Sequence, residues 1–168
     1  GVVYRAWQTR MNRPVALKVL PQAVAQDPAY RGRFGRDDIE RLVRWPDFSD
    51  PRWTQGVAER AQMLHEQTDY FVVMRMVASH GPFQTACDLR GTEAFLMDMA
   101  LNPDFAHALL DRITTAIEGL TRLAMQAGGK YFDMLELPGD DYAGNTNLLI
   151  SPVMFRKFIK PCIERLVN

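Results

Sequence analysis

Beyond residue 50 the chain alternates between two hydrophobic patterns. Residues 54–67 place apolar side chains at helical spacing, and a continuous apolar run follows at 70–76. The same order recurs at 103–127 and 131–137. Short runs that are apolar at every position are typical of strands with both faces buried in a parallel sheet. The alternation therefore predicts an α/β fold in which helices cover a parallel sheet.

Capping residues mark the ends of the expected helices. Asn102-Pro103-Asp104 supplies a capping side chain, a proline suited to the first helical position and an acid that complements the helix dipole. Gly128-Gly129 ends the same helix. Residues 80–83 break the first strand, and the next helix is expected to begin at Gly91. Ser151-Pro152 begins a last helix, which we expect to bend at Pro161.

The first 36 residues have a different pattern. Two runs rich in β-branched and aromatic residues, 2–7 and 15–20, flank a polar turn and predict an antiparallel hairpin. Gly1-Val2-Val3 and Val15-Ala16-Leu17-Lys18 resemble the glycine-rich loop and the lysine strand of a bacterial serine/threonine protein kinase small lobe. The stretch around Asp27-Pro28 resembles the start of the following kinase helix.

The kinase resemblance implies a nucleotide-phosphate contact for Lys18. No His-Arg-Asp or Asp-Phe-Gly motif follows, so the catalytic base and the metal ligand of a kinase are absent from the sequence. We therefore interpret Lys18 as a solvent-facing strand lysine that has lost its ATP-binding role.

A second resemblance covers about three quarters of the chain. Gly81-Pro82-Phe83, then Leu89 to Glu93, then Asn102-Pro103-Asp104 and finally Ser151 to Pro161 are similar to successive landmarks of the uroporphyrinogen decarboxylase superfamily. That superfamily also contains cobalamin-linked methyltransferases. The resemblance implies a (β/α)₈ TIM barrel, which takes about 250 residues. We expect residues 37–168 to be an incomplete piece of such a barrel, preceded by the kinase-like segment 1–36, with runs 70–76 and 131–137 parallel in one sheet.

The barrel resemblance implies where catalytic residues lie. Active sites of these barrels are built from loops at the C-terminal ends of strands. Asp140 and Asp141 follow the second strand run and could bind a cationic or pyrrole N–H group or a metal-bound substrate; the alternative is ordinary turn chemistry. His80 follows the first run and is either an acid, base or polar contact or a histidine packed beneath a loop.

Three further side chains are candidates for substrate contacts. Tyr142 either lines the rim of the pocket or fills it, and Phe83 belongs to the Gly-Pro-Phe landmark. Arg75 stands inside an apolar strand run, where an unpaired charge would be costly. It either meets an acidic substrate group inside the barrel or pairs with Asp133 or Glu136, and we favour the pair.

The amino-acid composition indicates which classes of binding partner to expect. Twenty basic and twenty acidic side chains cancel, which gives no electrostatic reason to expect nucleic acid or an anionic membrane. No apolar run reaches bilayer length, and the default expectation is a cytoplasmic protein with a small-molecule substrate, in which an oligomer is possible. Cys87 and Cys162 lack zinc-ligand spacing and are interpreted as packing residues. The resemblance implies zinc and a corrinoid only in a longer family member, so no metal or cofactor is expected in these residues.

The functional hypothesis is a fragment of a superfamily enzyme, of decarboxylase or corrinoid-linked methyltransferase type, that is inactive alone. Its substrate would be a tetrapyrrole or a methyl donor with a corrinoid protein. The alternative is a non-catalytic kinase remnant or ATP-binding regulatory module. Decarboxylases carry a tyrosine where this chain has Cys87 and Asp88, which argues against porphyrinogen decarboxylation. The Asp140-Asp141 loop and the helix that begins at Ser151-Pro152 resemble the methyltransferase-leaning branch.

Three further expectations concern the chain as a whole. Gly1 lies within the kinase-like motif and Asn168 within a predicted helix, so we expect the chain to be a piece of a longer protein. The join near Asp37 has no Gly/Ser/Pro-rich linker, which favours a rearranged or truncated reading frame over a natural two-domain protein. Half a barrel would also leave open sheet edges and fold poorly.

Overall fold

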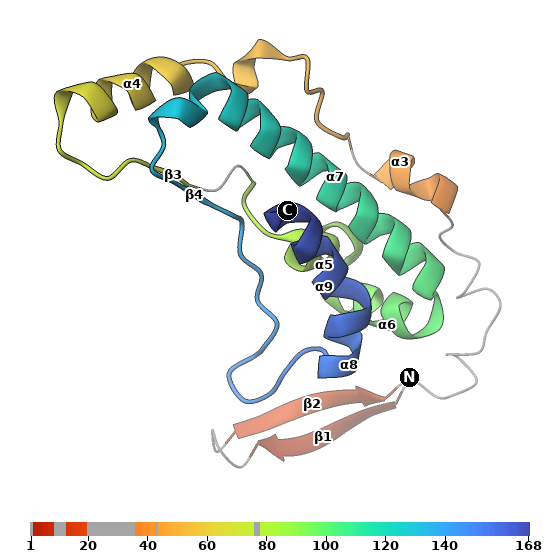
Figure 1. Cartoon of the computed structure of the whole chain (residues 1–168). Coiled ribbons are helices and arrows are strands. Elements are labelled where there is room, and N and C mark those ends of the chain that lie inside the picture. The colour runs from red at the N-terminus through yellow and green to blue at the C-terminus, as the bar shows by residue number, and fades with distance from the viewer. Residues whose placement is uncertain (1, 9–12, 20–35, 43, 76–77) are drawn as a thin grey trace.

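The hairpin expected at the N-terminus is present. The computed structural model describes residues 2–8, 13–19, 36–42, 44–75 and 78–168. Strands β1 (Val2–Gln8) and β2 (Arg13–Val19) pair antiparallel, with Tyr4 opposite Leu17 and Val3 opposite Lys18 (Figure 1). The predicted helix start at Asp27-Pro28 lies outside the described residues.

Helices dominate the rest of the described chain. A 3₁₀ turn at Arg36–Asp38 leads into α3, and another at Pro51–Trp53 precedes α4. The helices are α3 (Ile39–Leu42), α4 (Val57–Gln67), α5 (Pro82–Arg90), α6 (Thr92–Leu101), α7 (Pro103–Gly128), α8 (Pro152–Met154) and α9 (Lys160–Val167). A π-helical stretch, Phe155–Ile159, joins α8 to α9.

The two apolar strand runs pair in parallel, as the sequence predicts. Strand β3 (Val73–Arg75) lies beside β4 (Met134–Glu136), and Met74 stands opposite Leu135. Helices α5, α6 and α7 connect these strands, so the sheet and its crossover form an α/β unit. Within the described residues the parallel sheet has these two strands. The unit is consistent with part of an α/β fold, and a closed barrel stays a prediction.

Both strands are shorter than the seven-residue runs that predicted them. Tyr70 and Phe71 are 73% and 67% exposed and precede β3. The pairing starts where the backbone of Val72 meets Asp133, whose amide donates to the Val72 carbonyl at 2.8 Å. An apolar run becomes a strand only where a neighbour pairs its backbone, and the sequence pattern does not reveal how far the neighbour extends.

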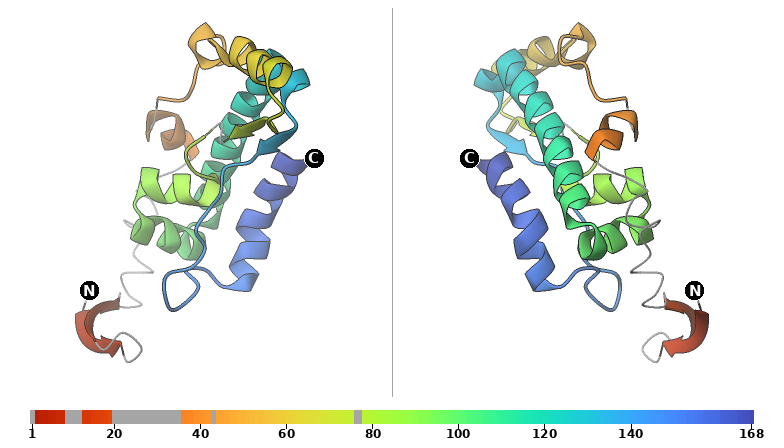
Figure 2. Two further views of the ribbon diagram at one scale, coloured as in Figure 1. Left: turned by 90° about the vertical axis from the view of Figure 1, so that its left-hand side faces the viewer. Right: turned by 90° about the vertical axis from the view of Figure 1, so that its right-hand side faces the viewer.

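Helix α7 forms the centre of the helical body. Figure 2 shows α5 and α6 on one side of α7 and α9 on the other, while α4 packs near its C-terminal end. The apolar stripe of α7 is buried as expected, with Phe105, Leu109, Leu110 and Ile113 almost inaccessible to solvent. Their side chains join those of Phe83, Phe95, Phe158 and Ile159 in one core.

Helix α5 corrects the expectation that the next helix starts at Gly91. The chain turns helical at Pro82, directly after Gly81, and Pro is well suited to the first helical position. Gly91, with φ of 86°, then separates α5 from α6. A positive φ of this kind is easily reached only by glycine, so Gly91 ends one helix and admits the next.

The C-terminal helix begins at the predicted cap. The Ser151 hydroxyl oxygen accepts a hydrogen bond from the Met154 amide at 3.2 Å. The predicted disturbance at Pro161 takes the form of the π-helical stretch Phe155–Ile159 immediately before it. Proline lacks the amide that a regular α-helix needs, so a local change of hydrogen-bond register is the expected response.

Candidate functional site

Two loops meet at the edge where β3 and β4 end. Because the strands are parallel, the segment after Arg75 and the segment after Glu136 leave the sheet at the same edge. The Gly81 amide donates to the Gly139 carbonyl at 2.8 Å and joins the two segments directly. Four of the predicted site residues therefore lie in or beside one junction: His80, Asp140, Asp141 and Tyr142.

Asp140 fastens this junction to α5. Its carboxylate accepts hydrogen bonds from the amides of Phe83 at 3.1 Å and Gln84 at 2.8 Å. The first amides of a helix have no partner within the helix, and the positive end of the helix dipole favours an anion there. Asp140 thus caps a helix that lies more than fifty residues earlier in the chain.

Gly81 lets the carboxylate come this close. A Cβ at position 81 would lie 2.6 Å from the carboxyl carbon of Asp140, far inside van der Waals contact. The backbone of Gly81 has φ of −71°, which any residue adopts. Space, and not backbone conformation, therefore requires glycine at this position.

Tyr142 completes the bonds to Asp140. Its hydroxyl donates to the carboxylate at 2.9 Å, and its ring packs on Phe83 and edge-on against Phe155, with centroids 5.7 and 5.1 Å away. Burial, and then the charge of Asp140, raises the pKa of Tyr142 far above its ordinary value. Tyr142 is therefore a neutral, partly buried donor to Asp140.

Phe83 lies in the core. Its side chain has no exposed surface and packs against Phe95 as well as Tyr142. The ring packs beneath Tyr142 and has no surface that a substrate could contact. The structure therefore gives no support to the predicted contact between Phe83 and a substrate.

His80 is exposed on the same junction. Its Nδ1 lies 3.0 Å from Oδ2 of Asp88, and both side chains are about half exposed, at 51% and 50%. Asp141, next to Asp140, is exposed. His80 and Asp141 thus present polar groups to solvent where β3 and β4 end, whereas Asp140 is partly buried.

Arg75 pairs with Glu136, one of the two partners that the sequence suggested. Its Nε lies 3.2 Å from Oε2 of Glu136, the residue directly opposite in the parallel pair. The Arg75 side chain is 74% exposed, so the pair lies at the surface and contributes little stability.

The site includes two residues that sequence reasoning missed. Asp88 accepts from His80, and Gln84 donates to Oδ1 of Asp88 at 3.0 Å. Gln84 and Asp88 are four residues apart on one helix, a spacing that brings side chains together. That signal was in the sequence, but it is visible only once α5 is recognised.

Both cysteines are packing residues, as predicted. Cys87 and Cys162 are free and buried, and burial raises the pKa of the Cys87 thiol to about 11 and also raises that of Cys162. Thiols held protonated in this way are poor nucleophiles and poor metal ligands. Across the described part of the chain, no group of three or more His, Cys, Asp or Glu residues is placed to hold a metal.

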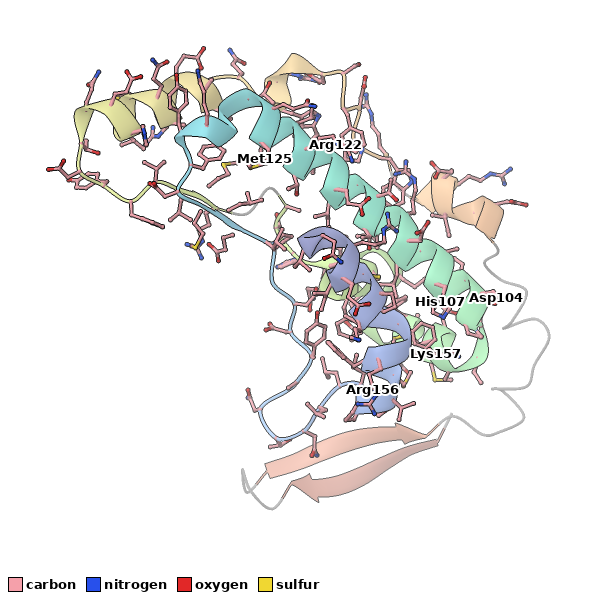
Figure 3. All side chains as sticks on the ribbon, in the orientation of Figure 1. Asp104, His107, Arg122, Met125, Arg156 and Lys157 are labelled. Carbon is pink, nitrogen blue, oxygen red and sulfur yellow. The ribbon has the colours of Figure 1, made fainter. Side chains whose placement is uncertain are left out.

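Among the cavities that the described residues line away from the junction are two that lie between packed elements. One of about 340 Å³ lies between α4 and the parallel strands, and its walls include Leu64, Val72 and Phe132. The other, about 300 Å³, lies between α7 and the C-terminal helix. There His107 stacks on Phe158 at 4.4 Å and lies near Lys157 (Figure 3); burial, and then Lys157, lowers the pKa of His107.

Lys18 lies in β2, for which the structure describes the backbone. The interpretation of Lys18 as a solvent-facing lysine without an ATP-binding role stays a prediction. None of the helices that the structure describes combines the length and the apolar character needed to span a membrane.

Comparison with known proteins identifies one family. A family model described as "Uroporphyrinogen decarboxylase (URO-D)" matches residues 24–168, most of the chain. The match also takes in residues 24–36, which the sequence interpretation assigned to the kinase-like segment. No curated protein and no solved structure matches.

Proposed function

Because the chain belongs to the uroporphyrinogen decarboxylase (URO-D) family, we propose that it forms part of an enzyme that binds a tetrapyrrole-class small molecule at the edge where β3 and β4 end. The observation that carries the proposal is the junction of the two loops, held by Gly81, Gly139 and Asp140 at that edge. In barrels built from parallel strands, this edge is where substrates bind.

We assign a role to each polar residue of the junction from its solvent exposure and from the hydrogen bonds that it already makes within the chain. Asp141 is exposed and would accept a hydrogen bond from a pyrrole or amide N–H of the ligand. His80 would be the proton donor or acceptor. Asp140 already accepts three hydrogen bonds, so we assign it to positioning both loops.

The reaction is either decarboxylation or methyl transfer. Three carboxylates, Asp88, Asp140 and Asp141, lie in or beside the junction. A porphyrinogen that carries several carboxylates would be repelled by them, whereas the amide side chains of a corrinoid would donate hydrogen bonds to them. The three carboxylates therefore favour methyl transfer, with a corrinoid as the ligand, over decarboxylation of a porphyrinogen.

Calorimetric titration of the whole chain with hydroxocobalamin and, separately, with uroporphyrin tests the proposal. We expect binding of at least one tetrapyrrole, weakened about tenfold, or about 1.4 kcal/mol, by Asp141→Asn or His80→Gln. Glu59→Gln, an exposed change on α4, is the control and should leave the affinity unchanged. If neither tetrapyrrole binds, or if the site variants bind as tightly as the control, the proposed site is wrong.

The choice of ligand separates the two reactions. Preference for hydroxocobalamin supports methyl transfer, and preference for uroporphyrin supports the decarboxylase type. The kinase-like origin of residues 1–36, the cytoplasmic location and the inactivity of the isolated chain stay predictions.

A further inference from the structure

The contact between His80 and Asp88 determines which ring nitrogen carries the proton. Nδ1 of His80 and Oδ2 of Asp88 are 3.0 Å apart, a hydrogen-bond distance. An ionised carboxylate can accept a hydrogen bond but cannot donate one. The shared hydrogen therefore belongs to Nδ1, and in the neutral ring Nε2 keeps a free lone pair.

The carboxylate that sets this arrangement is itself held in place. Oδ1 of Asp88 accepts a hydrogen bond from Nε2 of the Gln84 side chain at 3.0 Å. The backbone amide of Gln84 donates to Oδ1 of Asp140 at 2.8 Å. The Thr85 hydroxyl donates to the His80 carbonyl at 3.2 Å, which fixes the backbone of His80 against the same helix. Gln84 thus links Asp140, through its backbone, to Asp88, through its side chain, and Asp88 in turn contacts His80.

We infer that Asp88 is a positioning residue that holds His80 in the Nδ1–H tautomer, so that Nε2 is the acceptor offered to an N–H group of the ligand. The inference rests on the proposed function for the ligand, but the tautomer itself is a property of the free chain. A carboxylate that orients a histidine in this way acts through the ring and need not touch the substrate. The ligand class is a molecule with N–H donors, such as a pyrrole or a corrin amide.

Nitrogen-15 NMR of the imidazole rings at neutral pH tests the tautomer directly. The signals of His80 are identified by their loss in His80→Gln. We expect the neutral ring of the unaltered chain to carry its proton on Nδ1, and we expect Asp88→Ala to move it toward Nε2. Gln84→Ala, which leaves the Asp88 carboxylate but removes its support, should give a smaller shift, and Glu59→Ala should give none.

Two results would overturn the inference: Nε2–H in the unaltered chain, or a tautomer unchanged by Asp88→Ala. Ligand titrations then test the link to function. Asp88→Ala and His80→Ala should weaken tetrapyrrole binding by similar factors, about tenfold, and the double variant should lose no more than either alone. If the unaltered chain binds no tetrapyrrole, the proposed function fails, while the NMR result still decides the role of Asp88.

Discussion

At the scale of single residues, the junction depends on close approach between a glycine and a carboxylate. Gly81 and Asp140 come from segments on either side of three helices, and no local pattern links them. The sequence nominated Asp140 as catalytic because of its loop. In the structure its carboxylate accepts hydrogen bonds from the amides of Phe83 and Gln84, so Asp140 holds the loop against α5.

Gly81→Ala should destabilise the chain. The added methyl group would meet the Asp140 carboxyl carbon at 2.6 Å, and relieving that overlap breaks the cap of α5. We expect a loss of about 1–3 kcal/mol in the free energy of unfolding, measured by urea denaturation. Gly139→Ala is the matched control, because a Cβ there meets nothing within 4 Å and should be nearly neutral.

The loop geometry would be contradicted if both glycine variants were equally stable. Combining Gly81→Ala with Asp140→Ala adds a second check. Removing the carboxylate removes the overlap, so the double variant should lose less than the sum of the two single losses.

Tyr142 should make the fold weaken at high pH. Burial and Asp140 hold the folded-state pKa above the value of about 10 found in an unfolded chain. Above that pH the unfolded chain has released a proton that the folded chain retains, so stability falls as pH rises, by at most about 1.4 kcal/mol per pH unit for this proton. Well below pH 10 Tyr142 is protonated in both the folded and the unfolded chain, so its titration does not reduce the free energy of unfolding there.

Thermal melts across this range compare the unaltered chain with Tyr142→Phe. The phenylalanine variant should be less stable at neutral pH, by about 1 kcal/mol for the lost hydrogen bond, and should decline less steeply above pH 10. Tyr70→Phe is the control, because Tyr70 is 73% exposed and its loss should not alter the slope. Identical slopes for all three chains would show that Tyr142 does not carry this effect.

At the scale of elements, the sequence predicted the ends of α7 better than the lengths of the two parallel strands. Helix α7 has a proline and an acid at its start, an apolar stripe along its length and glycines at its end, and all of these are local signals. The start of α5 is equally local, but Gly81-Pro82 fits the end of a strand as well as the start of a helix. The lengths of β3 and β4 depend on which backbone lies alongside, so no pattern within either run could give them.

Leu109 should be among the costly positions of α7. Its side chain is fully buried in the core, so Leu109→Ala should reduce the free energy of unfolding by about 2–5 kcal/mol. Met125→Ala on the same helix is the control: Met125 is 44% exposed, near the C-terminal end of α7 (Figure 3), and should cost about 0.5 kcal/mol or less. Chemical denaturation measures both, and comparable losses would mean that α7 does not bury the stripe described here.

At the scale of the whole molecule, the parallel pair is flanked by exposed apolar side chains. Tyr70, Phe71, Val73 and Met134 all lie in or beside β3 and β4, and each is at least 39% exposed. Strand edges with apolar neighbours pair readily with other chains.

Phe71→Asp should therefore reduce self-association. In sedimentation experiments over a range of protein concentrations, we expect the unaltered chain to form larger species as concentration rises and the variant to do so at least about tenfold less readily. Val167→Asp places the same charge on a similarly exposed residue, far along the chain from the strands, and should behave like the unaltered chain. Equal association of all three would show that the strand region is not the contact surface.

The cap on α5 also makes two amides reporters of the loop that follows β4. The backbone amides of Phe83 and Gln84 donate to the two carboxylate oxygens of Asp140, Oδ2 and Oδ1, which lie 57 and 56 positions away in sequence. Their protection from deuterium exchange therefore depends on the docking of that loop as well as on the helix itself. Whenever the loop lifts off, these two sites should exchange before the rest of α5, so their rates would give the frequency at which the edge of the sheet opens.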